Sequence, residues 1–157
     1  MIFSLHPALA SKPFLLELTL CTVLLENEIH YPWLILVPRR ADKKMLMDLS
    51  FNDQILLLKE VDLCQRVVQD LYAPDQINIA ALGNKTPQLH VHVIGRFTND
   101  PAWPQAVWDH PTKKGYFNAD LFLKQKEIIK AFYQILSSAE KNPCYPSDEA
   151  VQSKLFS

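Results

Sequence analysis

The chain has 157 residues, of which 48% are hydrophobic and 21% charged, values typical of one globular domain with a buried core. A net charge of −1 without a basic stripe argues against a protein that binds nucleic acid through its phosphates. Three widely spaced cysteines argue against a disulfide framework and fit a cytoplasmic location. The most apolar run, residues 14–25, is too short for a membrane span, so we expect no membrane partner.

The first part of the chain predicts a pair of antiparallel strands. Pro7 and Pro13 limit regular structure in residues 1–13. Residues 14–25 alternate in the pattern of one half-buried strand. After a turn, residues 33–37 read as a second strand, which Pro38 closes.

A long amphipathic helix is predicted over residues 50–72. Ser50 suits its N-cap, and Asp53 stands three residues later. Apolar residues recur at three- and four-residue steps along it, and Pro74 ends the pattern. We expect this helix to lie on the sheet.

Residues 77–82 predict a third strand, and residues 83–87 form a turn into a fourth. In the segment 88–93 polar and apolar residues alternate, so Gln88, His90 and His92 share one face of the strand. The two imidazoles stand about 7 Å apart along it. An imidazole can transfer protons, attack an electrophile or bind a metal near neutral pH.

The remainder of the chain predicts a loop, a helix and a polar tail. Residues 97–116 are rich in Pro and Trp, and either flank the fourth strand's polar face or pack against the edge of their own sheet. Asn118 suits the cap of a helix that extends to about residue 136. The composition after Ser137 is polar.

The segment Gln88-Leu89-His90-Val91-His92-Val93-Ile94 resembles the signature of the histidine triad (HIT) superfamily, in a bacterial-type branch with Gln at the first triad position. The segment from Leu34 to Arg40 is similar to the strand and Pro-Arg/Lys end of the same family. The resemblance implies an α+β fold, with an antiparallel sheet, one long helix packed on it and, by pattern, a C-terminal helix. We expect a single domain over 1–157, with its core at about 14–97 and the loop, helix and tail in 98–157.

Three residues inherit catalytic positions from this resemblance. His90 matches the middle His, which is the family's nucleophile, and His92 matches the third. Gln88 stands where the first His is usual, nearest the leaving group. An amide donates a hydrogen bond but cannot deliver a proton as an imidazolium can, so we expect a preference for good leaving groups.

Five further residues are candidate nucleotide or phosphate contacts by the same resemblance. Asn27 matches a nucleotide-contacting Asn. Trp33 replaces a frequent His and is either a buried sheet aromatic or a base- or ribose-stacking group. Asn84, Lys85 and Thr86 lie in the turn that surrounds the α-phosphate in the family.

The resemblance implies a nucleotide hydrolase or nucleotidyl transferase that acts at the α-phosphate through a covalent nucleotidyl-His90 intermediate. Its substrates would be of the dinucleoside polyphosphate type, such as diadenosine polyphosphates, or nucleoside phosphoramidates. The mechanism requires no cofactor or metal, and any magnesium would arrive with the substrate phosphates. A homodimer is implied as well.

Two alternatives stay open. A protein on the same fold could bind nucleotide without turnover, since Gln88 and Trp33 both depart from the common pattern. A His-x-His pair can also bind a metal when a third ligand completes it. Candidates for that ligand are His6, His30, Asp100, Asp109 and His110.

Overall fold

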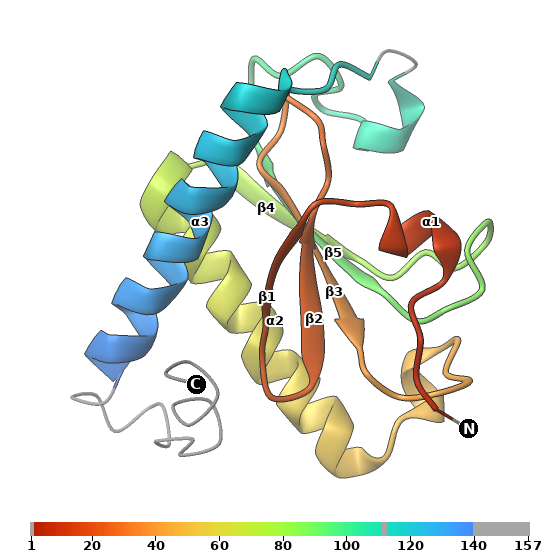
Figure 1. The fold of residues 1–157 in the computed structure, drawn as a ribbon. Helices are drawn as coiled ribbons and strands as arrows, with labels where there is room; N and C mark the ends of the chain where they lie inside the picture. The colour runs from red at the N-terminus through yellow and green to blue at the C-terminus, as the bar shows by residue number, and fades with distance from the viewer. Residues whose placement is uncertain (1, 111–112, 140–157) are drawn as a thin grey trace.

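The computed structural model describes residues 2–110 and 113–139, so the predicted polar tail lies almost wholly outside the described residues. Five strands form one antiparallel sheet in the order β1-β2-β3-β5-β4, which confirms the α+β prediction (Figure 1). The strands are β1 (Phe14–Glu17), β2 (Cys21–Leu25), β3 (Trp33–Pro38), β4 (Gln76–Ala80) and β5 (Val91–Arg96). The helices are α1 (Pro7–Ala10), α2 (Phe51–Tyr72) and α3 (Asn118–Ala139), with short 3-10 turns at Leu46–Asp48 and Val107–Asp109.

The single strand predicted over residues 14–25 is wrong, because the chain reverses between β1 and β2. The Leu18 N–H donates to the Cys21 carbonyl, which closes a tight turn. The Glu60 carboxylate of α2 accepts the N–H groups of Leu20 at 2.6 Å and Cys21 at 2.9 Å. Leu18 and Leu20 are buried although they lie in a turn, so the apolar alternation continues through it. The buried carboxylate that holds the turn comes from a distant helix.

The predicted hairpin between β2 and β3 is confirmed, with Cys21 opposite Pro38 and Leu25 opposite Leu34. The later strands are shifted from their predicted bounds. β4 ends at Ala80, and β5 begins at Val91 and continues to Arg96. Residues 88–90, which were predicted as the start of the fourth strand, lie before β5 as a lead-in outside the sheet.

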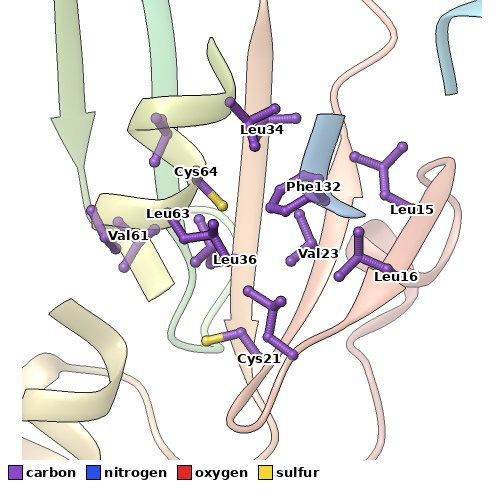
Figure 2. Close-up of a cluster of buried hydrophobic side chains, with 14 of the residues drawn as sticks. Leu15, Leu16, Cys21, Val23, Leu34, Leu36, Val61, Leu63, Cys64 and Phe132 are labelled. Carbon is purple, nitrogen blue, oxygen red and sulfur yellow. The ribbon is translucent and has the colours of Figure 1, made fainter. Parts of the chain in front are cut away.

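The two long helices pack on one face of the sheet. The Ser50 hydroxyl accepts the Asp53 N–H at 3.2 Å, as its N-cap position predicts. The last residue of α2 is Tyr72, and the C-cap residue Ala73 has a left-handed backbone conformation. Figure 2 shows apolar residues of α2 and Phe132 of α3 gathered around Leu34 and Leu36 of β3. Leu89, Val91 and Val93 join this core, so their predicted face is the buried one.

The opposite face carries a second, smaller apolar cluster. Leu9 of α1 and Val107 of the loop after β5 pack there with Trp33, Ile35 and Ile94 of the sheet. Figure 1 shows α1 and this loop away from the side that α2 and α3 cover. Because side chains alternate along a strand, His92 belongs to this face. In the described part of the chain, no helix combines the length and apolar character needed to cross a membrane.

Candidate active site

His90 and His92 lie side by side at the start of β5. Both are 6% exposed, and their ring centroids are 4.9 Å apart in an edge-to-face arrangement. β5 forms no earlier because the Leu89 N–H donates to Lys43 in the loop after β3 and not to a neighbouring strand. The alternation predicted from the sequence still holds through this lead-in, so Leu89 points into the core and His90 away from it.

A backbone carbonyl fixes the proton position on His90. Its Nδ1 lies 2.7 Å from the Gln88 carbonyl oxygen. A carbonyl can only accept, so Nδ1 carries the hydrogen and Nε2 keeps its lone pair. A nucleophilic imidazole needs this tautomer.

The indole of Trp33 fixes the opposite tautomer on His92. The Trp33 Nε1–H donates to His92 Nδ1 at 2.9 Å, and an indole N–H can only donate. In the neutral ring, Nε2 of His92 therefore carries the hydrogen and is a donor. Burial, followed by the charges of His90, Lys12 and Lys113, lowers the pKa of His92 to about 3. His92 thus stays a neutral donor through the physiological pH range.

Trp33 itself is 3% exposed and lies in the sheet-face cluster. Of its two predicted roles, the buried sheet aromatic describes its position, and its bond to His92 is a function that the sequence did not reveal. A Trp in a strand gives no signal for the partner of its N–H.

Trp33→Phe is expected to lower kcat/KM for nucleotide release by about fivefold, because one hydrogen bond of about 1 kcal/mol no longer fixes the His92 tautomer. The pKa of His92 should rise in the variant, since its Nδ1 becomes free to take a proton. NMR titration of the imidazole signals measures this shift. Trp108→Phe is the control, because Trp108 contacts the same rings. An unchanged His92 titration in Trp33→Phe would contradict the assignment.

The Pro- and Trp-rich loop flanks the histidines, which decides between its two predicted locations. The Trp108 ring lies 5.3 Å from His92 and 5.5 Å from Trp33, centroid to centroid. The loop is held at its start by the Arg96 guanidinium, which pairs with Asp100 at 2.7 Å. Trp108 therefore forms part of the wall around His92.

Gln88 adjoins His90, but its amide contacts the N-terminal segment. Its Oε1 accepts the His6 N–H at 2.8 Å, and its Nε2 donates to the Ser4 carbonyl at 2.8 Å. Both ends of the amide are thus used by backbone groups more than 80 positions away in the sequence.

The other predicted contacts lie farther out. Asn27 is half-buried, and its Oδ1 accepts the Tyr116 N–H at 2.8 Å, so it joins the hairpin turn to the segment before α3. Asn84 and Lys85 are exposed in the turn before Gln88, and Thr86 is half-buried there. Their nucleotide contacts stay predictions.

Two lysines near His92 were missed by sequence reasoning. Lys12 forms an ion pair with Glu26, and the Lys113 Nζ lies 3.8 Å from the same carboxylate and 5.7 Å from the Trp33 ring centroid. They are 101 positions apart in the sequence, so no local pattern could bring them together. Among the described residues, no group of three His, Cys, Asp or Glu side chains could hold a metal ion, so the His-x-His pair gains no third ligand there.

Comparison with known proteins finds relatives of similar sequence and fold. The family model of the HIT domain matches residues 10–99. A histidine triad protein from Bradyrhizobium japonicum has 35% identity and a TM-score of 0.80, covering 84% of this chain and 99% of that chain. One from Marinobacter aquaeolei has 36% identity and a TM-score of 0.81, covering 85% and 98%. One from Sinorhizobium meliloti has 36% identity and a TM-score of 0.78, covering 82% and 96%.

No curated protein matches the chain. The family match spans more than half of the sequence, and the three solved structures share both its fold and over a third of its aligned residues. The chain therefore belongs to the HIT family.

Proposed function

We propose that this protein cleaves or transfers a nucleoside monophosphate at its α-phosphate through a covalent nucleotidyl-His90 intermediate. One observation carries the proposal. The Nδ1–H of His90 is held by the Gln88 carbonyl, which leaves Nε2 as a free lone pair beside the neutral donor His92. A nucleophile and a donor with opposite, fixed tautomers form the minimal apparatus for in-line attack on phosphorus.

In the first step, Nε2 of His90 forms a bond to the α-phosphorus and the bond to the leaving group breaks, with its electron pair going to the leaving group. The charge that develops on the imidazole is stabilised by the Nδ1–H bond to the Gln88 carbonyl. His92 Nε2–H donates to a non-bridging oxygen as charge builds there. In the second step, water attacks phosphorus and gives up a proton to solvent. The N–P bond breaks with its electron pair returning to His90 Nε2, and the nucleoside monophosphate leaves.

The substrate class follows from the missing acid. Gln88 cannot protonate a leaving group, so groups that depart as stable anions should be favoured. Dinucleoside polyphosphates, including diadenosine polyphosphates, fit this requirement better than phosphoramidates of alkyl amines. The chain's own residues supply the chemistry without a cofactor, and any magnesium would arrive with the phosphates.

The proposal is tested by mixing the protein with a dinucleoside polyphosphate labelled at the α-phosphate and quenching the reaction rapidly without acid. We expect a label that is stable to base and labile to acid, as a phosphorus–nitrogen bond is, together with release of nucleoside monophosphate. A panel that adds nucleoside phosphoramidates and nucleotide sugars then ranks the leaving groups. Nucleotide binding with neither label nor release would instead indicate a binding protein on the HIT fold.

We also propose that two copies of the chain associate through the outer surface of α2 and β4. Phe51, Ile55 and Leu58 are spaced at four and three residues on one face of α2, and they are 75%, 40% and 68% exposed. β4 is the last strand of the sheet, and Ile79 on it is 48% exposed. Clustered apolar side chains beside an unpaired strand edge suit a self-complementary interface.

Leu58→Glu is expected to shift the protein from dimer to monomer, because it places a charge at the centre of this apolar surface. Sedimentation velocity measures the change. Leu123→Glu on α3 is the matched control, since Leu123 is 63% exposed but lies on a different helix. A wild type that sediments as a monomer, or equal effects of both variants, would contradict the interface.

A further inference from the structure

The side-chain amide of Gln88 forms two hydrogen bonds with the backbone of residues 4–6, as the backbone of a neighbouring strand would. It accepts from the His6 N–H and donates to the Ser4 carbonyl, the two groups on either side of Leu5. One residue of a parallel neighbouring strand would bind the same two groups, because it donates to the carbonyl of residue i−1 and accepts from the N–H of residue i+1. A side-chain amide can satisfy both partners at once, because it carries an acceptor oxygen and a donor nitrogen, whereas a carboxylate cannot donate.

We call residues 3–12 the N-terminal strap. It is fixed at three places along the face that carries the histidines. Gln88 holds its first part, buried Leu9 packs on the cluster of Trp33 and Ile35, and Lys12 forms an ion pair with Glu26 of the hairpin. Phe3 and Leu5 add partly buried apolar contacts. The strap therefore crosses the sheet from the lead-in of β5 to the start of β1.

We call the two hydrogen bonds between the Gln88 amide and the strap the clamp, and its position has a chemical consequence. Gln88 matches the triad position nearest the leaving group, yet both of its amide atoms are already bonded to the backbone of the strap. The groups that lie beyond it are those of the strap. His6 belongs to the strap and is the N-cap residue of α1. Its Nδ1 accepts the Ala8 N–H at 3.2 Å, so the neutral ring carries its hydrogen on Nε2.

We propose that Gln88 is a positioning residue, which fastens the strap along the leaving-group end of the site so that the strap, and not Gln88, contacts the leaving group. This inference rests on the proposed function for the location of that end. It explains why an amide stands at a position where the family usually has an imidazole. It also means that a histidine at position 88 would release the strap and would not supply the missing acid.

Hydrogen exchange tests the clamp without any need for turnover. In Gln88→Met, which keeps the length of the side chain but loses both hydrogen bonds, the His6 amide should exchange at least tenfold faster than in wild type. Gln125→Met is the matched control, because Gln125 also donates to a backbone carbonyl, that of Phe14, away from the histidines. Equal exchange of His6 in wild type and Gln88→Met would overturn the clamp.

A second measurement tests what the strap contacts. A dinucleoside polyphosphate with methylene bridges should slow exchange in residues 4–6 of the wild type, and this added protection should disappear in Gln88→Met. Binding without protection of these residues would overturn the strap's role but leave the proposed function standing. Failure of the analogue to bind at all would overturn both.

Kinetics of the Gln88→His variant distinguish a residue that holds the strap from a residue position that faces the leaving group and could protonate it. We expect kcat/KM to fall at least threefold on both good and poor leaving groups, with most of the change in KM, because the wall of the site is displaced. A tenfold gain on nucleoside phosphoramidates alone would show instead that position 88 faces the leaving group directly.

Discussion

His90→Ala is expected to reduce nucleotide release by a factor of about 10³ or more, because removal of a nucleophile leaves only binding and oxyanion stabilisation. The covalent label should vanish in the same variant. His92→Ala removes a donor to the developing charge and should cost about 10²-fold in kcat, while the label still forms slowly. Single-turnover release of labelled nucleotide measures both variants.

Loss of activity in His90→Ala could also arise from misfolding, because the imidazole is only 6% exposed. Thermal melting of the variant distinguishes the two causes. His110→Ala serves as a matched control in the loop that flanks the site, since His110 lies outside the motif and its ring faces His30 at 6.3 Å. Release that persists in His90→Ala at more than a tenth of the wild-type rate would contradict a covalent mechanism.

Local sequence patterns predicted those features that are determined by residues close in sequence or along one strand. The helix at α2 begins and ends where Ser50 and Pro74 indicate, because capping and ring geometry act within a few residues. The face shared by His90 and His92 was predictable because a strand alternates strictly, even where β5 has not yet begun.

What the sequence did not reveal depends on contacts between distant residues. The turn between β1 and β2 is held by Glu60, which is 40 residues away from Leu20. The roles of Trp33 and Gln88 depend on the single partners that accept or donate to their polar atoms, at separations of 59 and 82 residues. A residue type and its local period cannot specify such a partner. The candidate site was thus predictable in its histidines but not in the groups that orient them.

The wall of the site that carries Trp108 depends on one buried ion pair at the end of β5. The side chain of Arg96 is 2% exposed and that of Asp100 is 1% exposed, and the two share hydrogen bonds of 2.7 and 3.0 Å. The guanidinium also donates to Asn78 of β4 and to the Gln105 carbonyl in the loop. Arg96 therefore ties the loop to two strands, and Asp100 is its counter-charge.

Asp100→Ala is expected to lower the free energy of unfolding by about 3–5 kcal/mol, because it leaves the guanidinium of Arg96 buried without its counter-charge. Urea denaturation measures this loss. Asp62→Ala is the matched control, since Asp62 pairs with Arg66 at the same four-residue spacing but both side chains are about half exposed. The control should lose less than about 1 kcal/mol. Similar losses in the two variants would contradict a special role for the buried pair.

The same pair sets a pH dependence whose sign can be worked out. Burial acts to raise the pKa of the Asp100 carboxyl, but the Arg96 guanidinium and the N–H of Phe97 outweigh it, so the pKa lies below its usual value. A carboxyl with a depressed folded-state pKa contributes stability above its unfolded pKa of about 3.9, and this contribution is lost as the pH falls through the lower folded value. Wild type should therefore lose part of its advantage over Asp100→Ala only below about pH 4. Because the loop bears Trp108 against His92, the variant should also lose nucleotide release at neutral pH, where the ion pair is intact in wild type.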